Sequence, residues 1–455
     1  MLLLAACGGA ASCSSPDDGS EPAPVDAGSE ASATADGGVP SDGGSVDATS
    51  GDAAPPPFDG GPLPVVCSSD PCATSLVTTL ALSASDNDEG YCVLLRDGTV
   101  ACWGANGAGQ LGRDDHAGAP DNATAARVVG LTDVEELSHT CAVDKRGSVW
   151  CWGTGPYLRD DAGARTTERA PIKLALPPVK HVGMGMDVGC ASNDDGVLCW
   201  GSNAKGQLAP LSTIPAYELL PPRPIQLPSG APVREVFVGA TAFLLREDGQ
   251  VLSWGARASL ARLSPLSPDS YPVPIDLAGI SSMDTTSGNA CATVSGVGYC
   301  WGYLVRDPMG YFAESFGIDR DMGDSTLPQP VVAPEPLVQI TTTKSFVTGS
   351  FSPSGAFDGV VRPQRWCAVG ASGSVYCWGF NANGQAGDGT KRHAYQAVKV
   401  EGLPMTATQV KAMPDSTCAL LTNGKVYCWG ANYYGQLGNG EIKVRSLVPQ
   451  EVVLP

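Results

Sequence analysis

The stretch YCVLLRDGTVACWGANGAGQLG begins at Tyr91, and a close copy, TCALLTNGKVYCWGANYYGQLG, begins at Thr417. Both contain two cysteines ten residues apart, a turn with Gly between them, Trp-Gly, and a final Gly-Gln-Leu-Gly. Trp-Gly recurs seven times, at intervals of 49, 48, 54, 47, 77 and 51 residues, about the length of one propeller blade. The seven copies are at Trp103, Trp152, Trp200, Trp254, Trp301, Trp378 and Trp429. The repeat predicts an all-β, seven-bladed β-propeller with four-stranded blades.

The cysteines give the register of the hairpin inside each repeat. When Cys92 is set opposite Cys102, a three-residue turn ends on Gly98, where the left-handed conformation favours glycine. The apolar run that starts at Cys92 has no polar break, which indicates a strand buried on both faces. Trp-Gly is therefore expected to pack between blades. The same construction predicts left-handed glycines at Gly147, Gly249, Gly373 and Gly424.

Cysteines at directly opposite positions of an antiparallel pair lie close enough for a disulfide. We therefore predict one cross-strand disulfide per blade except the fourth, where Phe243 and Ser253 stand at the cysteine positions. Six pairs of reduced core thiols are the alternative. The predicted pairs are Cys92 with Cys102, Cys141 with Cys151, Cys190 with Cys199, Cys291 with Cys300, Cys367 with Cys377, and Cys418 with Cys428, with Cys67 and Cys72 as an extra candidate pair. Such cysteine use indicates an oxidising compartment and leaves the state of Cys13 open.

Each repeat contains two further strand-like segments. One precedes the cysteine strand, at residues 77–82, 134–137, 179–182, 233–238, 280–283, 338–341 and 410–413. The other follows Trp-Gly, at residues 127–131, 171–176, 224–227, 273–277, 330–332, 397–400 and 449–454. Because the domain opens with the first type and closes with the second, we expect the last strand to complete the first blade. The ring would then be closed by its N- and C-terminal strands.

The N-terminal part has a different composition. Residues 1–95 hold no Lys or Arg and account for −14 of the net charge of −19. Residues 1–13 look like a truncated lipoprotein signal, in which MLLLAAC ends at a lipid-anchoring Cys7. The positive start and longer apolar core of a full signal are missing, so either the coding sequence starts upstream or the match is a coincidence. Residues 14–64 are predicted to be a disordered acidic Ala/Gly/Ser/Pro/Asp tether, or merely unselected low-complexity sequence, and residues 65–455 the propeller.

The loop after Trp-Gly carries a family resemblance. Asn-x-x-Gly-Gln-Leu-Gly stands at Asn106, with related copies at Asn203, Asn381 and Asn432. With the cysteine strand, the Gly turn and Trp-Gly, this pattern resembles the repeat of the regulator of chromosome condensation family over about residues 76–455. The resemblance implies a seven-bladed propeller and functions that range from nucleotide exchange on a small GTPase to protein inhibition and scaffolding. Repeats four and five lack the Gly-Gln-Leu-Gly part, which leaves their loops unassigned.

The sequence contains no recognisable catalytic motif. Its four histidines form no metal-binding spacing, and no nucleophile elbow, phosphate loop or dinucleotide fingerprint is present. We therefore expect no enzyme activity, no cofactor and no metal. The acidic run from Asp86 to Glu89 lacks calcium-loop spacing and is expected to be a solvated loop. Asn106, Gln110 and their equivalents are expected to brace their own loops.

The least repetitive segments are the candidate partner-binding sites. An insertion of about twenty residues, 346–365, carries Phe346, Phe351 and Phe357, and the segment 303–324 carries Tyr303, Tyr311, Phe312 and Phe316. These aromatic residues indicate a partner-binding site, or else fold onto their own blade.

These features favour a non-catalytic protein-binding or scaffold module on a bacterial cell envelope, lipid-anchored at the outer membrane or cell surface, or else secreted. The partner would be another protein or an envelope polymer rather than a nucleic acid, and membrane contact would run only through the anchor. The alternatives are inhibition of a secreted or periplasmic enzyme and, by resemblance alone, guanine-nucleotide exchange.

Overall fold

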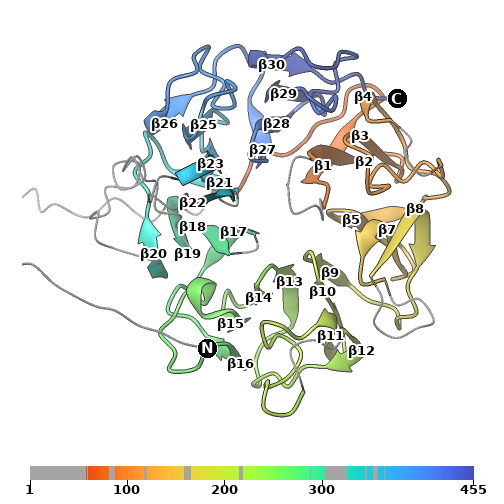
Figure 1. Cartoon of the computed structure of the whole chain (residues 1–455), viewed down its shortest axis with the longest axis vertical. Helices are drawn as coiled ribbons and strands as arrows, with labels where there is room; N and C mark the ends of the chain where they lie inside the picture. The colour runs from red at the N-terminus through yellow and green to blue at the C-terminus, as the bar shows by residue number, and fades with distance from the viewer. Residues whose placement is uncertain are drawn as a thin grey trace, which may run out of the picture. The chain divides into compact units, whose positions relative to one another are not determined.

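The repeats fold into seven antiparallel four-stranded sheets arranged as the blades of a ring (Figure 1). The structure, a computed structural model, describes residues 58, 60–80, 88–116, 120–157, 165–214, 219–286, 288–302, 325–343, 346–351, 357–362 and 364–455. Residues 325, 346–351 and 357–362 are described by their backbone alone. Residues 56–455 form one compact unit. The prediction of an all-β, seven-bladed propeller is confirmed.

Each blade uses four strands that occupy equivalent positions, counted from the centre of the ring outward. The innermost strands are β1 (Ala73–Thr78), β5 (Val134–Ser138), β9 (His181–Met184), β13 (Val233–Val238), β17 (Ile280–Thr285), β21 (Leu337–Thr342) and β27 (Ala407–Ala412). The cysteine-bearing second strands are β2 (Gly90–Leu95), β6 (Cys141–Asp144), β10 (Val188–Asn193), β14 (Thr241–Arg246), β18 (Asn289–Val294), β24 (Arg365–Gly370) and β28 (Ser416–Leu421), with β14 carrying Phe243 instead.

The third and fourth strands follow. The Trp-Gly strands are β3 (Val100–Gly104), β7 (Val149–Gly155), β11 (Gly196–Ser202), β15 (Val251–Gly255), β19 (Val297–Gly302), β25 (Val375–Gly379) and β29 (Val426–Gly430). The outermost strands are β4 (Asn122–Arg127), β8 (Thr166–Lys173), β12 (Leu219–Pro224), β16 (Asp269–Pro274), β20 (Ser325–Pro330), β26 (Ala394–Lys399) and β30 (Ser446–Glu451). A hairpin, β22 (Phe346–Phe351) and β23 (Phe357–Arg362), and a short 3-10 helix, η1 (Arg257–Ser259), complete the described elements.

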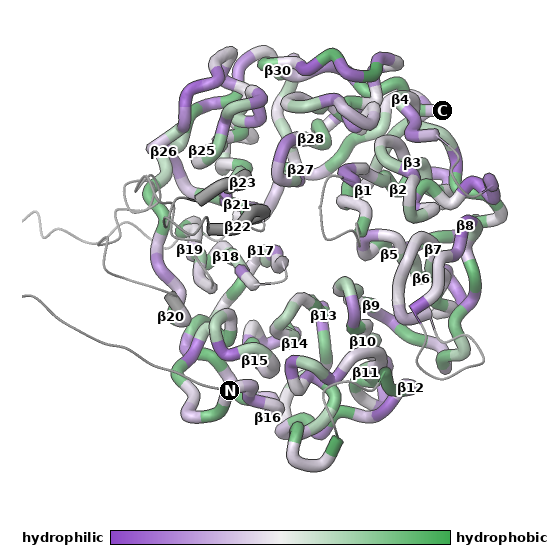
Figure 2. The backbone as a smooth tube through the Cα atoms, viewed as in Figure 1, coloured by the Kyte–Doolittle hydropathy of each residue, from purple (hydrophilic) through white to green (hydrophobic). Residues whose placement is uncertain are grey.

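The bounds of the inner strands were predicted more accurately from the sequence than those of the outer strands. The innermost strands lie within a few residues of the predicted segments, whereas most outermost strands begin about three to five residues earlier than predicted. The apolar residues that suggested the outer segments, such as Val128 and Leu131, are buried just after β4, in the link to the next blade. The outer strands themselves are half-buried and polar, and Figure 2 shows hydrophilic stretches on β4 and β8. A weak apolar signal is expected for a strand at the solvent-facing edge.

The expectation that the last strand completes the first blade is wrong. Strand β30 pairs with β29 in the seventh blade, and β1 pairs with β2 in the first. Each repeat runs from the innermost to the outermost strand, so repeat and blade coincide and β30 stays in the blade of its own repeat. The ring closes instead by packing of the seventh blade on the first, where Trp103, Leu76 and Tyr91 share a buried cluster with Leu420 and Leu437.

The cysteine hairpins have the predicted register. Cys92 lies directly opposite Cys102, and Phe243 opposite Ser253 in the fourth blade. The turn glycines Gly98, Gly147, Gly249, Gly373 and Gly424 all have positive φ, between 75° and 80°. All six cross-strand cysteine pairs are disulfide-bonded, as is Cys67 with Cys72.

The Trp-Gly pair joins each blade to the one before it. A bulge lies at Trp-Gly in all seven blades, between the third and fourth strands. A Cβ on Gly104, for example, would lie 2.5 Å from the Glu89 carbonyl oxygen. The indole N–H donates to a backbone carbonyl in the loop of the preceding blade at 2.8 to 3.0 Å in six blades, with Gln110, Pro156, Gln207, Ser259, Gln385 and Gln436 as acceptors. The tryptophans are therefore inter-blade packing residues, as the sequence indicated.

Candidate functional site

The strand order defines two faces of the ring. Since neighbouring strands of a blade are antiparallel, the first-to-second and third-to-fourth connections leave at the same end. We call this end the insertion face, because residues 346–362 are inserted there between β21 and β24. The other end, which carries the cysteine-hairpin turns, is the turn face. Strand β19 ends and β20 begins at the insertion face.

The predicted insertion forms a β-hairpin of its own. Strands β22 and β23 pair in continuous register, with Phe346 opposite Arg362 and Phe351 opposite Phe357. Two of the predicted aromatic residues therefore occupy facing positions at the end of the hairpin next to its turn. The remaining candidates, Tyr303, Tyr311, Phe312 and Phe316, lie outside the described residues, as does Cys7.

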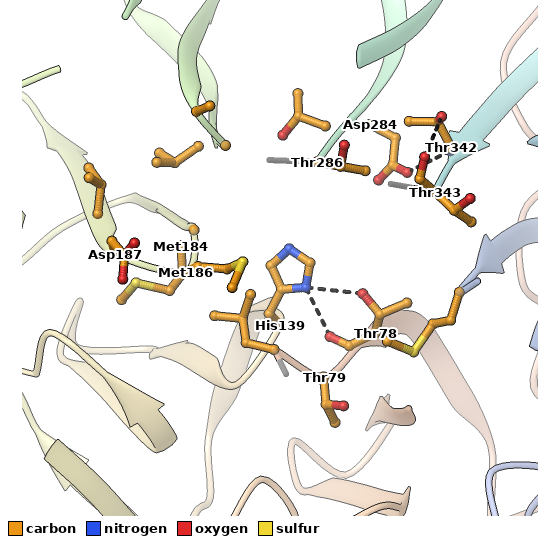
Figure 3. A pocket seen from close by; sticks show the side chains of 18 of the residues that line it. Thr78, Thr79, His139, Met184, Met186, Asp187, Asp284, Thr286, Thr342 and Thr343 are labelled. Atoms are coloured by element: carbon orange, nitrogen blue, oxygen red, sulfur yellow. Dashed lines mark hydrogen bonds between the residues drawn. The ribbon is translucent and has the colours of Figure 1, made fainter. Parts of the chain in front are cut away.

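The centre of the insertion face is hollowed into a pocket of about 240 Å³ at the mouth of the central channel (Figure 3). Its wall combines threonines, apolar side chains and a histidine drawn from several blades. Thr341, Thr342 and Thr343, at the base of the inserted hairpin, form part of this wall. The hairpin therefore starts at the rim of the pocket.

His139 stands at this mouth on a strained backbone. Its φ is 53°, in the left-handed region that non-glycine residues seldom adopt. Its Nδ1 lies 3.0 Å from the Thr78 carbonyl oxygen and 3.1 Å from the Thr78 hydroxyl. Burial lowers the pKa of His139, which favours the neutral ring. Because a carbonyl can only accept, Nδ1 carries the proton and Nε2 is left as an acceptor.

A second cavity, of about 410 Å³, lies next to the first along the inner strands and shares His139, Asp284 and Lys411 with it. Asp284 forms an ion pair with Lys411 at 3.0 Å and accepts from the Thr341 hydroxyl at 2.7 Å. His181 contacts Glu136 at 2.9 Å on the same cavity wall. Asp284 of the fifth blade is thus paired with Lys411 of the seventh, and His181 of the third blade with Glu136 of the second.

Loops of the sixth and seventh blades add an exposed surface to the insertion face. Tyr433, Ile442 and Val444 are 49%, 44% and 54% exposed. Lys443 and Arg445 lie between and beside them and are exposed as well. The two blades are joined here, since Asn383 of the sixth blade accepts from Arg445 Nη1 at 3.4 Å and from the Tyr433 hydroxyl at 3.5 Å. We call Tyr433 and residues 442–445 the seventh-blade loop patch.

Glu89, the last residue of the acidic run that was expected to be a solvated loop, is buried instead, whereas Asp86 and Asn87 lie outside the described residues. Glu89 is 1% exposed and accepts from the Asp415 N–H and the Ser416 hydroxyl of the seventh blade. Burial, with the nearby Asp415 charge, raises the pKa of Glu89 to about 7. Its carboxyl group belongs to the seam between the first and last blades, a role that no spacing in the sequence signalled.

The asparagine and glutamine side chains of the Gly-Gln-Leu-Gly loops brace their own loops, as predicted. Asn432 Oδ1 accepts from the Leu437 N–H at 3.1 Å, and Gln436 Oε1 from the Tyr434 N–H at 2.8 Å. The fourth blade lacks this motif, and a buried ion pair holds the corresponding loop instead. Arg262 and Asp269 lie 2.8 Å apart, and Arg262 also reaches Ser253, which stands at a cysteine position.

Within the described ranges, no group of three or more His, Cys, Asp or Glu side chains is placed to hold a metal ion. The histidines His116, His139, His181 and His393 belong to different repeats. Over the same ranges, no helix has the length and apolar character needed to span a bilayer.

Comparison with known proteins supports the resemblance. Residues 414–436 match the Regulator of chromosome condensation (RCC1) repeat. The chain is similar to the RCC1 repeat family. The Ultraviolet-B receptor UVR8 of Arabidopsis thaliana is 26% identical over 371 residues, which are 77% of each chain.

Two solved structures agree on the fold. Human WBSCR16 superposes with a TM-score of 0.59 at 18% identity, covering 78% of this chain and 95% of that one. Yeast RCC1 (Prp20), solved bound to Kap60, gives a TM-score of 0.56 at 18% identity, covering 77% of this chain and 83% of that one. At this level of identity the likeness concerns the propeller architecture.

Proposed function

We propose that this chain is a non-catalytic protein-binding or scaffold module that docks a protein partner on the insertion face. The observation that carries the proposal is the β22–β23 hairpin, which departs from the repeat and rises from the rim of the channel pocket. Its register sets Phe351 opposite Phe357, and aromatic residues are frequent anchors of protein interfaces. UVR8 is similar to this chain in sequence and Kap60-bound yeast RCC1 in fold, and the second is a protein complex by its own description.

The seventh-blade loop patch also favours the insertion face as the docking surface. Interfaces are enriched in Tyr and Arg and mix apolar with charged side chains, as Tyr433, Ile442, Val444 and Arg445 do. Exposed apolar side chains that follow one another along a loop are uncommon away from binding surfaces. We therefore place the hairpin and the patch in one docking region.

A crosslinking pull-down tests the proposal. The full chain is compared with the same chain lacking residues 346–362, and with a control that carries Lys145→Glu and Arg146→Glu on the turn face. We expect the control to capture the same protein as the unaltered chain and the hairpin deletion to lose it. Equal capture by the deletion variant would remove the hairpin from the site, and a captured hydrolase whose activity falls would favour the inhibitor alternative.

We propose further that the chain is anchored to a bacterial envelope through Cys7. The support is the MLLLAAC motif followed by a long acidic segment poor in apolar residues. Cells expressing the Cys7→Ser chain should lose incorporation of a labelled fatty acid and release the protein from the membrane fraction. Cys13→Ser, six residues away, is the matched control and should keep both. Incorporation that survives Cys7→Ser would refute the anchor.

A further inference from the structure

The junction between the seventh and first blades is built differently from the other six. At each of those six, the chain itself runs from the outermost strand of one blade into the innermost strand of the next. Because the first blade begins the ring and the seventh ends it, no such link joins these two blades. Residues 60–72, which precede β1, make the contacts at this junction, and we call them the strap.

The end of the strap reproduces the backbone contacts of a covalent link. At five junctions an N–H at the start of a blade donates to the turn glycine of the preceding blade at 2.8 to 3.2 Å, namely Val134 to Gly98, Val179 to Gly147, Gly279 to Gly249, Leu337 to Gly296 and Ala407 to Gly373. Ala73, directly after the strap, donates in the same way to Gly424 of the seventh blade at 2.9 Å. The Cys72 carbonyl oxygen accepts from the Arg96 N–H at 2.9 Å, as the Thr406 carbonyl oxygen does from the turn of its own blade at 3.0 Å. Cys72 therefore stands where the last residue of a link would stand.

The earlier part of the strap lies across the turn face of the last blades. The Val66 N–H donates to the Thr422 carbonyl oxygen of the seventh blade at 2.7 Å. Leu63 packs so closely on the turn of the sixth blade that a Cβ on Gly373 would lie 2.9 Å from its Cδ1. Phe58, just before the strap, packs against the buried cluster of the fifth, sixth and seventh blades. The strap thus bridges the last blades and the first.

The Cys67–Cys72 disulfide lies where the strap passes from the seventh blade to the first. Val66 is bound to the seventh blade, whereas Arg96 of the first blade donates to the Cys67 carbonyl oxygen at 3.2 Å and to the Asp70 carboxylate at 2.7 Å. Arg96 and Asp70 are both exposed, and exposed ion pairs contribute little to stability. The disulfide, rather than this ion pair, is therefore what keeps the short turn of residues 67–72 closed.

This disulfide is also easier to reach than the other six of the described residues. The cysteines of the hairpin disulfides are buried, each 6% exposed or less, whereas Cys67 is half-buried and flanked by exposed Val66 and Ser68. Thiol–disulfide exchange requires that an attacking thiolate reach a sulfur atom. A reductant in solution therefore meets Cys67 before any hairpin cysteine.

We propose that Cys67–Cys72 is a redox-sensitive catch that holds the ring closed on the turn face and frees the strap when a dithiol reduces it. One thiolate of the reductant attacks Cys67 Sγ, the bond between the two sulfur atoms breaks, and Cys72 leaves as a thiolate that takes up a proton. The second thiolate then attacks the mixed disulfide and frees Cys67. Two electrons pass to the cysteine pair, and the reductant becomes a disulfide.

The reduced strap loosens one side of the seam only. On the insertion face, Glu89 and Ser416 still join the first and seventh blades. On the turn face, the residues bound to the seventh blade and those bound to the first are no longer held together by the closed turn. The catch goes beyond the proposed docking of a protein partner and does not depend on it.

Differential alkylation of the full chain tests the order of reduction. The native protein is treated with dithiothreitol for increasing times, free thiols are trapped with an alkylating agent in denaturant, and the modified cysteines are read by mass spectrometry. We expect Cys67 and Cys72 to become reduced at least about tenfold faster than any hairpin pair, with Cys190 and Cys199 as the reference. Equal or faster reduction of a hairpin pair would overturn the proposal.

Hydrogen exchange tests the release of the strap. In the selectively reduced chain the Ala73 amide should exchange at least about fivefold faster, whereas the Ala407 amide, which makes the same bond at a covalent junction, should be unchanged. The double variant Cys67→Ser, Cys72→Ser should show the faster Ala73 exchange without a reductant. An unchanged Ala73 rate, or an equal rise at Ala407, would overturn the proposal. If the double variant does not fold, the reduced chain still decides the matter.

Discussion

The Glu89 carboxylate of the first blade accepts a hydrogen bond from the Ser416 hydroxyl of the seventh blade at 2.5 Å. It also accepts from the Asp415 N–H at 2.6 Å. Tyr91 joins the same serine through its hydroxyl at 2.9 Å, and Arg365 of the sixth blade contacts the Ser416 carbonyl oxygen. Residues more than 300 positions apart in the chain thus meet in one buried polar group of contacts, where the ring closes.

The seam gives the protein a pH-dependent stability. The pKa of Glu89 is raised from 4.5 to about 7 by burial and by Asp415, with Arg365 acting in the opposite direction. A raised carboxyl pKa means that the folded state binds the proton more tightly than the unfolded state. Its contribution is therefore complete below pH 4.5 and is lost as the pH rises through 7, by up to about 3 kcal/mol.

Urea unfolding between pH 5 and pH 8 measures this effect. Glu89→Gln should flatten the decline of unfolding free energy over that range, whereas Glu441→Gln, at an exposed position, should leave the decline unchanged. The same slope in the Glu89→Gln variant and the unaltered chain would show that Glu89 does not titrate there.

The cross-strand disulfides should each add moderate stability. Cys141 and Cys151 close a loop of about ten residues, for which loop-closure entropy predicts about 2 to 3 kcal/mol. The double variant Cys141→Ala, Cys151→Ala should lose this amount in urea unfolding. Cys67→Ala with Cys72→Ala removes a five-residue closure and should cost less. A larger loss from the second pair would argue against the entropic account.

Two glycines of one loop should differ in their tolerance of a side chain. Gly435 and Gly440 both have positive φ, 79° and 87°. A Cβ at Gly435 would lie 2.5 Å from the Ala123 Cα of the first blade, whereas a Cβ at Gly440 would meet nothing within 4 Å. Gly440→Ala should cost about 1 kcal/mol from backbone strain, and Gly435→Ala at least about 2 kcal/mol, since the seam must also move apart. Equal midpoints of thermal unfolding for the two variants would contradict this close approach.

The fourth blade should depend on its buried ion pair. Asp269 is 4% exposed and accepts from Arg262 and from Ser264. Arg262→Met leaves this carboxylate without its cation and should cost about 3 to 5 kcal/mol in urea unfolding. Adding Asp269→Asn to Arg262→Met removes the buried charge and should recover part of the loss. No recovery in the double variant would mean that Arg262 acts through its backbone contacts with Ser253 and Tyr271 alone.

Local chemistry made much of the fold predictable. A Gly such as Gly98 is needed wherever a three-residue hairpin turn requires positive φ, so the cysteine register followed from spacing. Seven Trp-Gly pairs indicated the number of blades because each marks one bulge, and six of the indoles donate to the preceding blade. The bounds of the outer strands were predicted less accurately, since a half-exposed edge strand such as β4 carries little apolar pattern.

Contacts between distant repeats decided the rest. No spacing reveals that Glu89 meets Ser416, that His139 and Asp284 line one pocket, or that β30 stays in its own blade, because each depends on how the ring closes. The sequence by itself determined the repeating unit, its turns and its disulfides, which rest on interactions between residues close in the chain. Only the tertiary structure decided the seam and the channel, because packing in a closed ring brings together side chains whose separation in sequence carries no periodic signal.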